Sequence, residues 1–258
     1  MRRRNIQIAL DPLLVPGAVI VLLEVLGRVS HLDSYSLALP SQVLVALWGA
    51  VSDGSIWSST AQTLTAAFVG ASVGCCIGLA LGVALGLSPT LNKITSFTIE
   101  LLRPIPSVAL IPIIVLVSGL GFATEISIVA FGTVWPTLVL SRAAIAGIDA
   151  RLIEVSDALR LSLAARIWKI ILPSILPHLF VAFRLAIGFA LVIAITVEIT
   201  TNPIGLGYAM VLAQNALNPS LMLANLMWIG TLGALLNTLL AWTQMALFGR
   251  WTDLEHVQ

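Results

Sequence analysis

The sequence predicts an all-α membrane protein with six transmembrane helices. Its 258 residues are 59% hydrophobic and only 10% charged, whereas a soluble domain carries roughly 25% charged residues. Several nearly uncharged stretches reach about 20 residues, which is the length that a helix needs to cross a bilayer. We expect one membrane domain over residues 1–258, with its core at about 58–249. The predicted spans are 12–29, 58–87, 98–118, 123–145, 174–199 and 221–246.

The first span follows a basic N-terminal head, and the basic residues as a whole predict the orientation. Cytoplasmic segments of membrane proteins are enriched in Lys and Arg. With the N-terminus inside, twelve of the thirteen basic residues, Arg184 included, lie on the cytoplasmic side or at its helix ends, and Arg28 lies outside. Glu24 stands one helical turn before Arg28 and can pair with it. We therefore predict that both termini are cytoplasmic.

The second span carries a glycine at every fourth position over five positions. A glycine inside a helix costs about 1 kcal/mol relative to alanine in water, but small residues at this spacing let a neighbouring membrane helix approach closely. We favour a helix-packing seam, and a groove that lines a substrate path is the alternative. The row consists of Gly70, Gly74, Gly78, Gly82 and Gly86.

The longest cytoplasmic segment, 146–172, mixes charged residues with large apolar ones such as Leu152, Leu159 and Trp168. A connector surrounded only by water has no need of these apolar side chains. Two interpretations follow. The segment is either an amphipathic helix that lies on the lipid headgroups, or a short helix pair that presents a mixed apolar and charged face to a partner protein.

This segment resembles the EAA loop of binding-protein-dependent ABC importer permeases. The family pattern is E-A-A, three residues, G, nine residues and I-x-L-P. Glu154 and the run Ile170-Ile171-Leu172-Pro173 match it in identity and spacing, whereas Val155 and Ser156 replace the two alanines and Arg160 occupies the glycine position. The stretches LLRPIPSVALIPIIVLVSGLGFATEISIVAFGTVWPTLV and VEITTNPIGLGYAM are similar to the sulfonate, taurine and nitrate permease branch. The resemblance extends over roughly residues 35 to 250.

The resemblance implies the type I ABC importer permease fold and a permease subunit without catalytic residues or a metal of its own. The chain has no G-x-x-x-x-G-K-[ST] loop to hold ATP phosphates, so ATP and Mg would be used by a separate ATPase. The implied partners are two ATPase copies, a second permease copy, an extracytoplasmic solute-binding protein and the lipid of a bacterial inner membrane. The implied cargo is a small anionic solute. A net charge of +1 gives no reason to expect nucleic-acid binding.

The resemblance also assigns the residues that couple the permease to its ATPase. Arg160 cannot adopt a positive φ angle cheaply, so we expect the loop to bend elsewhere, or the ATPase to compensate the charge of Asp157. We expect Pro173 to end the loop and start the fifth span. The expected coupling residues are Glu154, Val155, Ser156, Asp157, Ala158, Leu159, Arg160, Ser162, Leu163, Ile170, Leu172 and Pro173.

Polar and helix-breaking residues in the later spans are candidates for the translocation pathway. The prolines of the third span indicate either a kinked scaffold helix or a pathway wall, where Arg103 and Ser107 would approach the substrate. Glu198 near the outer end of the fifth span is either an interface anchor or part of a gate or of the contact with the binding protein. The GLGY run at 205–208 predicts a re-entrant or surface turn on the outer side. The candidate pathway residues are Arg103, Ser107, Pro112, Glu198 and Thr201.

The alternative function is a secondary transporter or channel that needs no ATPase. Such a carrier normally has ionisable coupling residues deep in the membrane, and the predicted spans contain almost none. A membrane-embedded enzyme is a third class. It would need clustered His, Asp or Cys, whereas the three histidines are far apart and the two cysteines are adjacent, which also gives no metal-ligand spacing.

Overall fold

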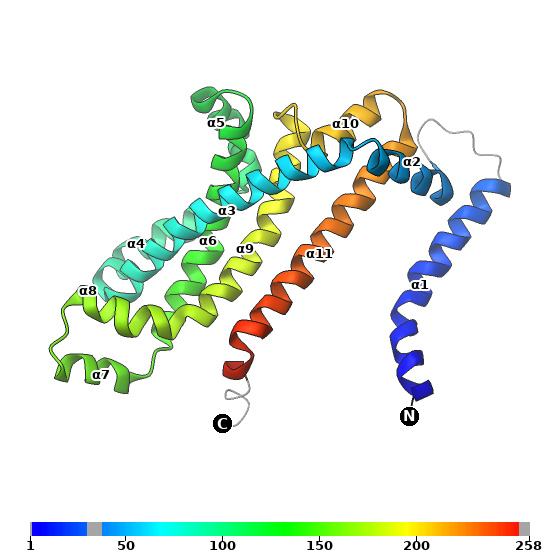
Figure 1. Ribbon diagram of the computed structural model, residues 1–258. Helices are drawn as coiled ribbons and strands as arrows, with labels where there is room; N and C mark the ends of the chain where they lie inside the picture. Colours follow the sequence, from blue (N-terminus) through cyan, green and yellow to red (C-terminus); the bar gives the residue numbers. More distant parts are fainter. Residues whose placement is uncertain (1, 30–37, 253–258) are drawn as a thin grey trace.

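The computed structural model describes residues 2–29 and 38–252, and every regular element in these ranges is a helix (Figure 1). The all-α prediction is confirmed for this part of the chain. The α-helices are α1 (Arg2–Val29), α2 (Pro40–Ser52), α3 (Ser55–Leu87), α4 (Pro89–Leu102), α5 (Ile111–Ser118), α6 (Phe122–Ala146), α7 (Ala150–Ala158), α8 (Leu163–Arg166), α9 (Leu172–Thr200), α10 (Leu206–Asn215) and α11 (Pro219–Thr252). A 3-10 turn, η1 (Ser107–Leu110), precedes α5, and a π-helical turn, η2 (Ile167–Ile171), joins α8 to α9.

Four helical segments of the described ranges are long and apolar enough to cross a membrane, and a bent pair of helices makes a fifth. The remaining predicted span, 12–29, lies within α1, but the side chains before Val15 lie outside those described. The number of six spans therefore stays a prediction. The qualifying segments are Ser55–Leu87, Phe122–Ala146, Leu163–Thr200 and Pro219–Gly249, with Pro89–Leu102 and Ser107–Ser118 as the bent pair.

The third predicted span, 98–118, is not one helix. It is the last part of α4, residues 98–102, followed by η1 and α5, and α4 is bent by 83° from the segment Ser107–Ser118. Pro104 and Pro106 lie at the break, and because a proline has no backbone N–H and clashes with the preceding turn, two of them close together end a helix. The kinked-helix interpretation is thus correct in kind, but the change of direction is much larger than a kink.

Pro173 lies in the first turn of α9, as predicted, but it does not end the helix before it, so the helical segment of the fifth span begins earlier than expected. Residues Leu163–Thr200 form one continuous helical segment, in which the N–H of Leu172 donates to the carbonyl of Ile167, five residues back. Pro173 can donate no N–H to the preceding turn, and the π-helical turn lies directly before it, where it accommodates the missing bond. The coupling segment is therefore joined to the fifth span without an interruption.

The core of the membrane domain lies where α3, α6 and α9 meet. Its buried side chains are small, so the helices approach closely. The main cluster consists of Ala67, Ala71, Val129, Ile187, Ala190 and Ala194. A second cluster joins α2, α10 and α11 to this core through residues such as Leu191, Leu206 and Leu232.

The glycine row of α3 lies against α6 over four turns. A Cβ atom at Gly74 would stand 2.0 Å from Thr133 Oγ1 and 2.4 Å from the carbonyl oxygen of Ala130. A Cβ at Gly78 would stand 2.6 Å from the carbonyl oxygen of Val134. The other three glycines meet α6 in the same way, at distances of 2.6 to 3.0 Å. This geometry agrees with the packing seam and not with a substrate-lining groove.

Helix α1 stands apart from the rest of the molecule and meets it through α2 (Figure 1). Glu24 forms the predicted ion pair with Arg28, at 2.6 Å, and accepts hydrogen bonds from the backbone N–H and the hydroxyl of Ser41. Figure 1 also shows α7 and α8 at the same end of the molecule as the start of α1 and the end of α11. The termini of the described chain and the coupling segment thus share one side, whereas the side of the membrane stays a prediction.

Candidate functional site

The coupling segment is a pair of short helices joined by a tight turn. Helix α7 begins at Asp149, whose side chain accepts a hydrogen bond from the N–H of Arg151 at 2.9 Å. Helix α8 begins at Ser162, whose hydroxyl accepts from the N–H of Ala165 at 3.3 Å. Side-chain oxygens at these positions satisfy N–H groups that have no partner within the helix. The sequence thus fixes where each helix starts.

Arg160 forms the bend between the two helices, with a φ angle of 48°. The N–H of Leu161 donates to the carbonyl of Ser156 at 3.1 Å, and the N–H of Arg160 donates to that of Asp157 at 3.0 Å. These two bonds define a Schellman motif, which requires a left-handed residue at the position of Arg160. Our expectation that the loop bends elsewhere is wrong, because the helix end demands this conformation even from an arginine.

Asp157 has a partner within the segment itself. Its carboxylate forms an ion pair with Arg166 at 3.2 Å, and Arg166 also donates to the carbonyl of Ile153 at 3.5 Å. The pair joins the two helices across the turn. Because Asp157 is largely exposed, the pair contributes at most about 1 kcal/mol. A compensating charge on a partner protein is not needed to explain the acidic residue.

Most of the predicted coupling residues form an exposed surface. Leu159 and Leu163 are 65% and 66% exposed, and Val155 is 50% exposed. Ser156 is buried, and its hydroxyl donates to the carbonyl of Ile153, while Ile170 and Leu172 are half-buried. The other exposed members of the set are Glu154, Asp157, Ala158, Arg160, Ser162 and Pro173.

The five candidate pathway residues do not come together. Arg103 and Ser107 line one cavity of about 460 Å³, in the angle between α4 and η1, with Trp135 and Phe189 among its other walls. Gly132 lets η1 approach α6, because a Cβ there would stand 3.2 Å from Ser107 Oγ. The lining of this cavity does not include Pro112, Glu198 or Thr201.

Glu198 is 1% exposed and joins α9 to α3 and α10. Its Oε1 accepts from the hydroxyl of Thr63 at 2.6 Å, and its Oε2 accepts from the N–H of Gly207 at 2.7 Å. A Cβ at Gly207 would stand 2.4 Å from the carbonyl oxygen of Ile195. The GLGY run is thus the buried start of α10 and not a surface turn, and Gly207 permits this close approach. The interface-anchor interpretation of Glu198 is wrong, because the carboxylate faces other helices.

Two functional candidates were missed at the level of sequence. Glu125, in the first turn of α6, is 1% exposed and accepts a hydrogen bond from Asn202 at 2.5 Å. Arg184 was assigned to the cytoplasmic side, but it lies twelve residues beyond the first residue of α9, Leu172, and donates to Asn237 and Gln244 of α11. A glutamate and an arginine within otherwise apolar helical runs were the available signals.

A family model described as "Binding-protein-dependent transport system inner membrane component" matches residues 74–253. The chain belongs to this family. It is 30% identical over 247 residues to the putative aliphatic sulfonates transport permease protein SsuC of Escherichia coli (strain K12), covering 96% of this chain and 94% of the relative. It is 28% identical to the taurine transport system permease protein TauC of the same organism, covering 85% of this chain and 83% of the relative.

The fold of this permease is also that of a solved ABC importer. A chain of the MetNI methionine ABC transporter in an inward-facing conformation superposes with a TM-score of 0.67 at 22% identity, covering 74% of this chain and 95% of that chain. The resemblance drawn from the EAA-like segment is confirmed. The protein is a permease subunit of an ABC importer, of the sulfonate, taurine and nitrate branch, with the type I importer permease fold.

Proposed function

We propose that this permease forms the translocation pathway of an ATP-driven importer in a bacterial inner membrane, with both termini in the cytoplasm. A separate ATPase would dock on the coupling segment, residues 146–172. The observation that carries the proposal is the exposed apolar surface of this segment, because Val155, Leu159 and Leu163 leave half or more of their surface uncovered. Exposed apolar patches of this kind mark sites of interaction with other proteins or with membranes.

The shape of the segment favours an ATPase over lipid headgroups. Its two helices are fixed to each other by the Schellman motif at Arg160 and by the pair of Asp157 with Arg166. An exposed glutamate, Glu154, lies beside the apolar residues. An anionic membrane surface attracts Lys and Arg but repels a carboxylate, whereas a protein cleft can supply a partner for it.

We infer the remaining partners from the same evidence and from the relatives. Two ATPase copies would use ATP and Mg, and a solute-binding protein would deliver a small anion like those named for SsuC and TauC. A second copy of this chain would complete the membrane domain. Helix α1 supports this pairing, because it stands apart from α11 while Val19, Leu22 and Leu26 are about half exposed. No bound cofactor is proposed for the permease itself.

Charge reversal at Glu154 tests the proposal. In proteoliposomes that contain the ATPase, Glu154→Arg should abolish co-purification and substrate-stimulated hydrolysis, because it places an unpaired charge in a partly buried interface. Asp53→Arg is the matched control, since it makes the same change of charge between α2 and α3, and the junction of these helices lies at the opposite end of the molecule from α7 (Figure 1). Full activity of Glu154→Arg with stronger binding to anionic lipid would instead favour the headgroup interpretation. Solute accumulation by the permease without any ATPase would favour a secondary transporter.

A further inference from the structure

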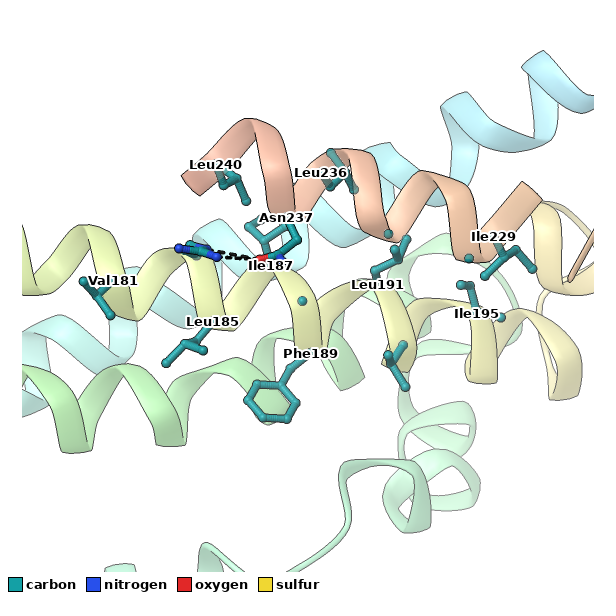
Figure 2. A pocket seen from close by; sticks show the side chains of 15 residues that line it. Val181, Leu185, Ile187, Phe189, Leu191, Ile195, Ile229, Leu236, Asn237 and Leu240 are labelled. Atoms are coloured by element: carbon teal, nitrogen blue, oxygen red, sulfur yellow. Dashed lines mark hydrogen bonds between the residues drawn. The ribbon is translucent and has the colours of Figure 1, made fainter. Parts of the chain in front are cut away.

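A groove of about 740 Å³ runs between α9 and α11 (Figure 2). Ligand sites of proteins typically measure about 300 to 1,000 Å³. Of the 15 residues that line it, all but Arg184 and Asn237 are apolar or glycine. A Cβ at Gly188 or Gly230 would meet no atom within 4 Å, so the groove has free space above these glycines.

Arg184 places a positive charge at this groove and is held there by neutral groups. Its Nε and Nη2 donate to the side-chain oxygen of Asn237 at 3.1 and 3.0 Å, and dashed lines mark these bonds at Asn237 in Figure 2. Its Nη1 donates to Gln244 at 3.3 Å. A guanidinium has five N–H donors, so two are left for a ligand. The ion pairs found in the described part of the chain are those of Arg28 and Arg166, and neither involves Arg184.

The depth of Arg184 in the helix makes this arrangement unusual. At 1.5 Å per residue, the twelve residues after Leu172 place it about 18 Å along α9. Ionisable residues within membrane spans are costly and most often mark the path of a substrate or ion. Arg142 offers a contrast. It also donates to an asparagine, Asn92, but it lies four residues before the last residue of α6, where a long side chain can reach the interface.

We propose that this groove binds the transported solute, and that the solute is an organic anion with an apolar body, such as an alkanesulfonate. The anionic head would bind the free N–H groups of Arg184, and the alkyl part would lie along the apolar walls. A small inorganic anion such as nitrate would leave those walls uncovered. This inference rests on the proposed function, since it identifies the cargo and one site on its path.

The neighbouring cavity fits this assignment. Phe189 lines both the groove and the cavity that contains Arg103 and Ser107. Each of the two cavities therefore contains one arginine, and the side chain of Arg103 makes none of the hydrogen bonds or ion pairs found in the described part of the chain. A solute that leaves Arg184 would meet a second positive charge beyond Phe189.

Binding to the purified full chain in nanodiscs of zwitterionic phosphatidylcholine tests the inference. The probes are ethane-, butane- and hexanesulfonate, with sodium nitrate for comparison, and the readout is equilibrium binding by calorimetry. We expect saturable binding that strengthens about fourfold for each buried methylene group. Binding that does not depend on alkyl length, or nitrate that binds as tightly as hexanesulfonate, would overturn the proposed solute class.

Variants of the groove separate its charge from its shape. Arg184→Gln should weaken hexanesulfonate binding about 10- to 100-fold, because a charge-assisted hydrogen bond is lost, and Arg184→Lys should retain most of it. Gly230→Leu should fill the groove without a backbone clash and also weaken binding. Arg142→Gln is the matched control and should bind like the wild type. If Gly230→Leu and Arg184→Gln both bind normally, the groove is not the site.

Native mass spectrometry of the same samples identifies competing occupants. A phospholipid retained by the wild type, lost from Arg184→Gln and not displaced by hexanesulfonate would show that the groove holds lipid, and would refute the proposal. The proposed function fails in a different experiment, namely if the ATPase does not co-purify with the wild-type permease. The nanodisc measurement needs no ATPase, so the two failures are distinguishable.

Discussion

Gly74 offers the sharpest test of how the membrane domain is held together. Replacing it with alanine adds a single methyl group, which would stand 2.0 Å from the hydroxyl oxygen of Thr133 and 2.4 Å from the carbonyl oxygen of Ala130. The hydroxyl can move by rotation about χ1. The carbonyl cannot, because it belongs to the backbone of α6, so α6 must withdraw or α3 must tilt.

The size of the effect follows from these distances. An ordinary van der Waals contact of a Cβ begins at 3.4 Å, so relief of a 2.4 Å contact needs a shift of about 1.0 Å, which also disturbs the neighbouring turns of the seam. Overpacking of this kind costs about 1–3 kcal/mol, and a backbone clash belongs at the upper end. Alanine recovers about 1 kcal/mol of helix propensity. We expect Gly74→Ala to lower the free energy of unfolding by about 2 kcal/mol.

The measurement is equilibrium unfolding in mixed micelles of mild detergent and sodium dodecyl sulfate, followed by helical circular dichroism. Gly49→Ala in α2 is the control, because a Cβ there meets no atom within 4 Å. It should be neutral or stabilising by up to about 1 kcal/mol. If Gly74→Ala proves as stable as Gly49→Ala, α3 and α6 do not pack through the glycine row, and the seam must be abandoned.

Three further changes test other parts of the structure. Gly78→Leu should prevent the close approach of α3 and α6 altogether. The folded permease should then be lost, or its thermal midpoint should fall well below that of Gly74→Ala. Normal transport by Gly78→Leu would contradict this. Arg160→Gly should stabilise the purified permease by about 1 kcal/mol, since a glycine adopts the positive φ angle of this position without strain. It should also leave the coupling to the ATPase intact. Lost coupling would mean that the arginine contacts the ATPase itself. Glu198→Gln should destabilise the folded permease by about 1–3 kcal/mol, because one amide oxygen cannot accept from both Thr63 and Gly207. Glu125→Gln keeps an acceptor for Asn202 and should cost less. Equal effects of the two variants would show that the donors to Glu198 find other partners.

Local patterns predicted most of the architecture. The glycine spacing of α3 determines which face can meet another helix, because small residues four apart lie on one side. Pro40 occupies the first turn of α2, a position where a proline is well tolerated. Each of these features depends on residues within a few turns of one another, so the sequence is sufficient to recognise them.

Features that depend on distant residues were not predictable in the same way. Glu198 is buried because Thr63 and Gly207 supply its hydrogen bonds, and Thr63 is 135 residues away along the chain. Arg184 faces a groove because α11 brings Asn237 to it, over a separation of 53 residues. Even the bend at Arg160 was missed for a related reason. Residue preferences disfavour a positive φ angle in arginine, but the hydrogen bonds of the helix end outweigh that preference.

The continuous helical segment from Leu163 to Thr200 connects the features discussed above. It begins in the coupling segment, passes Arg184 in its middle and carries Glu198 in its last turn, where the carboxylate holds the start of α10. In the proposed mechanism, an ATPase that displaces α8 would therefore move the whole helical segment Leu163–Thr200 as one body. The π-helical turn at Ile167–Ile171 interrupts the regular α-helical bonding of this segment, and such turns are often found at functional sites. A movement that the turn does not absorb must reach both the groove and the α10 contact, which couples the cytoplasmic end to the opposite end of the fold.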